Sequence, residues 1–195
     1  MSASDHRLPD HPFWDFSLGV YMTPGVGPAC VALQDAHGLD VNIVLFCAWV
    51  GASGRGAMTG AEMDEVTGAV SVWHTEVVRA LRAVRTRMKG GMPPAPDALS
   101  ESLRQRIQKV EIDCEHTEQL MLAAALDRAA DDSLPPAARA RDAAANIALY
   151  CGRQGYALSD ADRGSFAVIL GVAFPGLDAA ETAEIAASMG DGGGA

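Results

Sequence analysis

The chain has 195 residues, of which 49% are hydrophobic and 21% charged, a composition typical of a folded domain and not of a disordered segment. Its formal net charge of −10 excludes a protein that is basic all over and coats nucleic acid. Alanine is abundant and aromatic residues make up only 6%. This bias favours closely packed helices, so we expect an all-α fold.

The apolar runs and the cysteines indicate a cytoplasmic protein. The longest apolar runs span residues 43–50 and 166–174, far short of the roughly 20 residues that a membrane-spanning helix needs. The first residues lack the apolar stretch of a secretion signal. The four cysteines lie far apart and form no metal-binding pair motif. We therefore expect buried thiols in a reducing cytoplasm and no contact with a membrane.

Three helices are predicted after a polar, disordered segment at residues 1–10. Pro12 is placed to open the first helix, and the Thr-Pro-Gly sequence at 23–25 ends it. The second helix covers about 26–37, before a glycine suited to a helix end. The third, about 41–50, follows the capping residue Asp40 and is nearly all apolar, which predicts a central position.

A glycine-rich loop at 51–60 leads to a predicted antiparallel hairpin of two long helices, about 61–89 and 99–130. Apolar residues recur in the first helix at spacings of three and four: Met63, Val66, Val70, Trp73, Val77, Leu81, Val84 and Met88. The second helix has a stripe of the same period: Leu103, Ile107, Val110, Cys114, Thr117 and Met121. If these stripes face the core, Glu111, Glu115 and Glu118 lie largely outside as a solvated acidic face.

Shorter helices are predicted for the remainder of the chain. Residues 11–130 are expected to form a helical core domain, with 134–190 as a C-terminal helical appendage packed on it. Ser159 is expected to cap one helix of this set, and Asp178 with Glu181 to form a capping box on the last. The glycine-rich tail at 191–195 is predicted to be disordered.

Charge is distributed unevenly along the chain. The stretch from Arg79 to Lys109 contains eight basic and two acidic residues. Its formal net charge is therefore +6, and that of the remainder of the chain is −16. The hairpin would bring the basic residues to one tip: Arg79, Arg82, Arg85, Lys89, Arg104 and Arg106. We therefore expect a non-enzymatic interaction or adaptor protein that binds an anionic partner, either another protein or an anionic ligand. Duplex nucleic acid is the least suitable partner, because only one tip is basic.

A pocket between the first three helices is the alternative prediction, in which the protein binds or transforms a small molecule. Its candidate residues are Trp14, Tyr21, Gln34, Asp35 and Trp49. The same region is rich in polar residues between apolar helices. We expect Gln34, Asp35, Asp40 and Asn42 to form a buried hydrogen-bond network that fixes the helix geometry.

A metal site on the fifth helix is a second alternative. Asp113 and His116 lie three residues apart, as in the carboxylate–histidine pairs of di-iron helical bundles, but a second such pair is absent from the sequence. Neither His37 nor His74 lies in a catalytic motif, and both are expected to be structural, His37 by contacting the carbonyls at its helix end. The sequence predicts no catalytic residue and no cofactor.

The helical segments resemble an uncharacterised family of small bacterial proteins, DUF2390, over about residues 12–122. Its opening signature is similar to Phe13–Leu18, Tyr21, Pro24–Val26, Cys30, Leu33–Asp35, Gly38, Asp40–Asn42 and Trp49. A second block resembles Trp73, Val77–Val78, Leu81–Arg82, Arg85 and Lys89, and a third Glu111–Gln119. Family members often have proline where this chain has Ala80, so we expect the helix at 61–89 to be unbroken. The resemblance implies a small cytoplasmic helical protein and supplies no catalytic residues.

Overall fold

A computed structural model describes residues 8–190, and this part of the chain contains helices and no strand, which confirms the all-α prediction. The ends expected to be disordered, 1–10 and 191–195, lie outside the described residues except for 8–10, which form no helix. In chain order the elements are α1 (Pro12–Tyr21), α2 (Val26–His37), α3 (Val41–Ala52), α4 (Gly60–Trp73), the π-helical turn η1 (His74–Val78), α5 (Arg79–Arg87), α6 (Asp97–Ala124), α7 (Pro136–Arg153), α8 (Asp160–Ala173) and α9 (Ala179–Ala187).

The residues predicted to begin or end helices do so in the structure. Pro12 is the first residue of α1, and Gly38 ends α2 in the left-handed conformation, with φ of 68°. Asp40 caps α3 by accepting a hydrogen bond from the backbone N–H of Asn42. Capping boxes open α8 at Ser159 and α9 at Asp178. Local chemistry therefore sets most of the helix starts.

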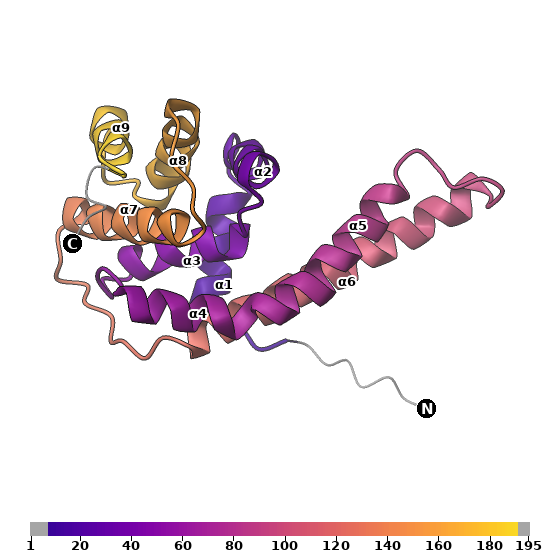
Figure 1. Ribbon diagram of the computed structural model, residues 1–195, viewed down its shortest axis with the longest axis horizontal. Coiled ribbons are helices and arrows are strands. Elements are labelled where there is room, and N and C mark those ends of the chain that lie inside the picture. The colour runs from indigo at the N-terminus through magenta and orange to yellow at the C-terminus, as the bar shows by residue number, and fades with distance from the viewer. Residues whose placement is uncertain (1–7, 191–195) are drawn as a thin grey trace.

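The core is built around α3. Ten consecutive residues of this helix, Asn42–Gly51, are buried, because α7 runs along one side while α1, α6 and α8 cover others (Figure 1). One hydrophobic cluster contains α3 residues such as Phe46 together with Ile147 from α7 and Phe166 from α8. The C-terminal helices thus bury the same central helix as the N-terminal ones.

Within residues 8–190, no single helix is long and apolar enough to cross a membrane. Helices α1 and α2 reach that length and composition only as a pair, and the pair is bent by 96° at the break between them. Each of the two helices buries part of its apolar surface in the hydrophobic core, for example Phe13 and Leu33.

The first predicted hairpin helix is interrupted, contrary to the expectation of an unbroken helix. Helix α4 passes into the π-helical turn η1 at His74 and resumes as α5. A π turn contains an extra residue, so it rotates the following side chains onto another face. Val78 is consequently fully buried instead of Val77, and Val84 is 50% exposed, although both Val77 and Val84 belong to the predicted stripe.

The prediction of which face of the second hairpin helix, α6, is buried is wrong. Val110 is 48% exposed, whereas Glu111 and Glu118 are 3% and 0% exposed. The buried set of α6 is Ser100, Glu111, His116, Glu118, Gln119 and Leu122. A polar face of α6 is therefore turned inward. The helix also ends at Ala124, before the predicted end near 130.

Helix α5, the loop that follows it and the first half of α6 extend away from the other helices (Figure 1). We call this segment, residues 79–110, the arm. The main packing partners of α5 are η1 and α6, and no residue of α5 is buried. The arm is therefore a two-helix structure that no third helix of the described part of the chain covers.

Candidate functional site

The inward polar face of α6 meets two arginines from α5, which form what we call the arginine cluster. Arg82 Nε lies 3.0 Å from Glu111 Oε1, and Arg85 Nε lies 2.5 Å from Glu111 Oε2. Arg82 also donates hydrogen bonds to Glu115 and to the side-chain oxygen of Gln34 on α2. The cluster therefore joins the base of the arm to α2 in the body of the protein.

The charges of the arginine cluster compensate one another. Burial alone would raise the pKa of Glu111, but hydrogen bonds from Arg85 and Arg82 hold that pKa below its ordinary value. For Glu115, burial dominates over the attraction of Arg82 and raises the pKa of its carboxyl. Glu111 is thus the ionised partner that both guanidinium groups share.

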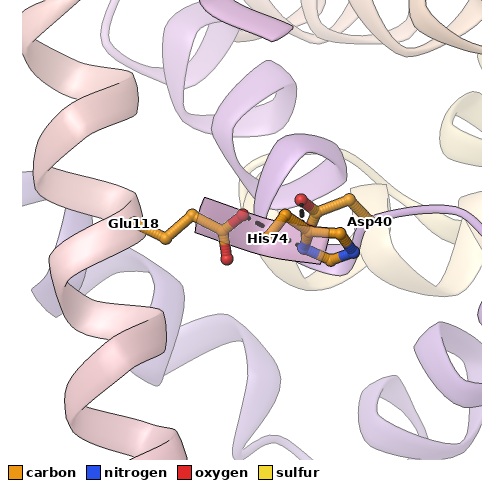
Figure 2. A group of neighbouring side chains, drawn as sticks. All are labelled: Asp40, His74 and Glu118. Carbon is orange, nitrogen blue, oxygen red and sulfur yellow. Dashed lines mark hydrogen bonds and ion pairs between the residues drawn. The ribbon is translucent and has the colours of Figure 1, made fainter. Parts of the chain in front are cut away.

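A second polar group, which we call the histidine centre, consists of Asp40, His74 and Glu118. Figure 2 shows Glu118 reaching from α6 toward His74 and Asp40. His74 Nδ1 lies 2.8 Å from Asp40 Oδ2 and 3.1 Å from Glu118 Oε1. Burial opposes a charge on the imidazole, but the two carboxylates outweigh it and raise the pKa of His74 to about 9. Burial, reinforced by the neighbouring Asp40, raises the pKa of Glu118 to about 7.

Amide side chains extend this polar interior. Asn42 Nδ2 donates to Glu118 Oε2 at 2.8 Å, and Gln119 Nε2 donates to both Asn42 Oδ1 and Ser17 Oγ at 2.8 Å. The prediction of a buried network around Asp40 and Asn42 is therefore confirmed. Of the other predicted members, Gln34 belongs to the arginine cluster and Asp35 is exposed.

A pocket of about 750 Å³ opens between α1, α2, α3, α5 and α6. Four of the five predicted pocket residues line it: Trp14, Tyr21, Gln34 and Asp35. The fifth, Trp49, does not. It is 7% exposed and stacks on Phe13 in the core, with the guanidinium of Arg55 4.3 Å from its ring. Trp49 lies on the nearly all-apolar helix α3, and its burial in the core removes it from the pocket.

The six basic residues assigned to the hairpin tip are divided among three environments. Arg82, Arg85 and Lys89 line the pocket, the two arginines with carboxylates of their own chain as partners. Arg104 is paired with Glu101, three residues earlier on α6. Arg79 and Arg106 are exposed. Inward-facing glutamates neutralise Arg82 and Arg85, so these two are not free for an anionic partner, whereas binding of such a partner by the basic residues stays a prediction.

Within residues 8–190, the proposed metal pair Asp113 and His116 is not brought together with a third ligand. Asp113 is exposed, whereas His116 is buried and stacks on Trp14 at a centroid distance of 4.1 Å. His37 likewise differs from its predicted role, because its Nε2 lies 2.9 Å from the Asp162 carboxylate on α8. Among the described residues, the histidine that gathers with two carboxylates is His74.

An apolar groove of about 610 Å³ lies along the arm, and we call it the arm groove. It is lined by Ala83, Val84, Arg87, Met88, Met92, Ala95, Pro96, Leu99, Ser100 and Leu103. Val84 is 50% exposed, Leu99 63% and Leu103 48%. The groove thus concentrates exposed apolar side chains from both helices of the arm.

The comparisons with known proteins concern the same segments. The model of a family described as "Protein of unknown function (DUF2390)" matches residues 12–122. The chain belongs to the DUF2390 family. No curated protein and no solved structure matches it. The DUF2390 region contains α1 to α5 and nearly all of α6, and with them the pocket, the arginine cluster, the histidine centre and the arm groove.

In this DUF2390 protein, sequence reasoning missed the roles of His74, Glu111 and Glu118. A signal was present, because Glu111, Glu115, Glu118 and Leu122 recur at the same spacing of four, three and four as a core stripe. Three basic residues on η1 and α5 pair with these glutamates, namely His74, Arg82 and Arg85. A core face chosen from apolar residues alone does not reveal this pairing of glutamates with basic residues.

Proposed function

We propose that this protein is a non-enzymatic interaction protein whose arm groove binds an acidic, amphipathic helix of a partner protein. The observation that carries the proposal is the exposed apolar groove on a two-helix arm. Because two helices cannot cover each other's apolar surface, Val84, Leu99 and Leu103 remain in contact with solvent. Concentrated apolar surface of this kind on a folded domain is typical of a docking site.

The charge around the groove favours an acidic partner. Within the described residues, Arg79, Arg87, Lys89, Arg106 and Lys109 take part in no ion pair, and all five lie on the arm or its loop. Arg87 itself lines the groove. These cations would steer and orient acidic side chains at the rim, while the apolar groove supplies most of the affinity. The four free cysteines support the proposed cytoplasmic location.

Site-specific photo-crosslinking in cell lysate tests this proposal. A photoreactive amino acid at Leu99, in the arm groove, should capture an acidic helical segment of another protein, identified by mass spectrometry. The same amino acid at Val72, which is 66% exposed on α4, is the matched control. Capture at Leu99 should decline as salt rises, because the rim cations become screened.

Variants of the groove give the quantitative prediction. The double substitution Val84→Glu and Leu99→Glu should weaken binding of the captured partner at least tenfold, or about 1.4 kcal/mol, while Val72→Glu leaves the affinity unchanged. Equal capture from positions 99 and 72, or a captured segment without acidic residues, would contradict the proposal. Capture of a second copy of this chain would assign the groove to self-association instead.

A second candidate function, small-molecule binding, is supported by the pocket of about 750 Å³. Three cations and three carboxylates line it, namely Arg82, Arg85, Lys89, Asp35, Glu111 and Glu115. Such balanced charge suits a polar ligand that carries both signs. Native mass spectrometry of the purified protein should then detect a bound metabolite, which Tyr21→Ala would remove. Mass spectra free of any ligand from several expression hosts would count against this function.

A further inference from the structure

The histidine centre joins residues from three separate parts of the fold. Asp40 lies at the start of α3, His74 opens the π turn η1, and Glu118 lies near the end of α6 (Figure 2). We propose that these three side chains bind a divalent transition-metal ion such as Zn²⁺ or Mn²⁺. This goes beyond the interaction proposed for the arm, and neither proposal depends on the other.

The donor atoms have suitable positions and chemistry. One nitrogen, His74 Nδ1, and one oxygen each from Asp40 and Glu118 lie within 4.8 Å of one another. The two separations of 2.8 and 3.1 Å from Nδ1 approach the ~3.3 Å expected between donors around an ion with bonds of ~2.0 Å. An imidazole nitrogen with two carboxylate oxygens is a donor set for borderline divalent ions once the ion displaces the proton of Nδ1 into solvent, and three protein ligands leave a position open.

The hydrogen bonds around the centre orient both carboxylates toward it. Asp40 Oδ1 accepts from the Asn42 backbone N–H at 2.9 Å, and Glu118 Oε2 accepts from Asn42 Nδ2 at 2.8 Å. The other oxygen of each carboxylate, Asp40 Oδ2 and Glu118 Oε1, is the one that faces His74. Such support of the ligands by an outer partner is characteristic of protein metal sites.

A further observation concerns Asp40 Oδ2, which lies within the centre. Asp40 is 5% exposed, yet no hydrogen bond reaches its Oδ2. Its partner is His74, whose Nδ1 lies 2.8 Å away in an ion pair and is also 3.1 Å from Glu118 Oε1. Two carboxylate oxygens thus share one nitrogen, and a metal ion between them would satisfy both.

The pocket lies next to the centre. Asn42 and Gln119 line the pocket, and Asn42 contacts Glu118 directly. The centre therefore lies one side chain behind the pocket wall. The π turn that begins at His74 sets the position of this ligand, and single π turns inside α-helices often mark functional sites.

Metal titration of the tag-free, chelator-treated protein tests the proposal. We expect one equivalent of Zn²⁺ to bind by calorimetry, and Co²⁺ to give the visible absorption of a low-coordinate site. Glu118→Gln keeps the side-chain shape but removes a charged ligand. It should weaken Zn²⁺ binding at least about 100-fold, because loss of an outer partner alone costs 10–100-fold.

His37→Gln is the matched control, because His37 pairs with a single carboxylate, Asp162, and should leave metal affinity unchanged. Asn42→Ala tests the site without removing a ligand, and we expect about 10–100-fold weaker binding. Failure of the folded wild-type protein to bind Zn²⁺, Mn²⁺ or Co²⁺ in stoichiometric amount would overturn the proposal. Binding that Glu118→Gln and Asn42→Ala leave unchanged would also overturn it, whatever the result for His37→Gln.

Discussion

Substitution of Gly51 by alanine should destabilise the protein by about 3 kcal/mol, the upper end of ordinary overpacking effects. Gly51 lies where α3 packs directly against the backbone of α7. A Cβ atom there would lie 2.5 Å from the backbone nitrogen of Ala143 and 2.6 Å from the carbonyl oxygen of Arg139. Both contacts are with backbone atoms, so the two helices would have to separate. Thermal unfolding should show Tm lowered by roughly 6–12 °C.

Gly68→Ala is the matched control for this prediction. Gly68 lies on the exposed side of α4, and a Cβ there would meet no atom within 4 Å. Alanine is the better helix former, so this variant should be stabilised by about 0.5–1 kcal/mol. A Tm for Gly51→Ala equal to or above that of the wild type would show that α3 and α7 pack differently from the structure.

The sequence was informative about where helices begin and end. Proline at position 12, glycine at 38 and the capping residues Asp40, Ser159 and Asp178 act locally, so each can be read without knowledge of the fold. Four of the five predicted pocket residues line one pocket for a similar reason, since they lie on two consecutive helices.

Which face of α6 is buried depends on residues elsewhere in the chain. Viewed alone, the stripe that contains Val110 is the better core face, and the face with Glu111 and Glu118 belongs in water. Arg82, Arg85 and His74 reverse this preference, because they neutralise the glutamates at close range. The alignment of these basic side chains with the glutamates also depends on the π turn, and no local sequence pattern predicts that turn.

Because the glutamates and their partners are interdependent, the arm and the body are linked through few residues. Arg82 contacts Gln34 on α2 as well as Glu111 and Glu115 on α6. The arginine cluster therefore fixes the direction in which the arm leaves the body. An arm that presents a docking groove needs such a fixed base, since flexibility there would have to be lost on binding.

Glu111→Ala should have the second large effect on stability, a loss of about 2–4 kcal/mol. The Glu111 side chain is 4% exposed and bonds both Arg82 and Arg85, whose side chains are 23% and 19% exposed. Removing it leaves two mostly buried guanidinium groups with less compensation, a change that typically costs 3–5 kcal/mol in fully buried pairs. Partial access of water to the arginines reduces this cost. Urea unfolding of the variant should show a lower midpoint with an unchanged slope.

A double-mutant cycle distinguishes lost pairing from lost packing. Arg85→Ala in the Glu111→Ala background should cost less than Arg85→Ala in the wild type, because the Glu111 carboxylate that Arg85 pairs with is already absent. Glu101→Ala is the surface control: its carboxylate pairs with Arg104 but is half exposed, so no measurable loss of stability is expected. Strictly additive effects of Glu111→Ala and Arg85→Ala would mean that these two side chains are not energetically coupled and would contradict the pairing.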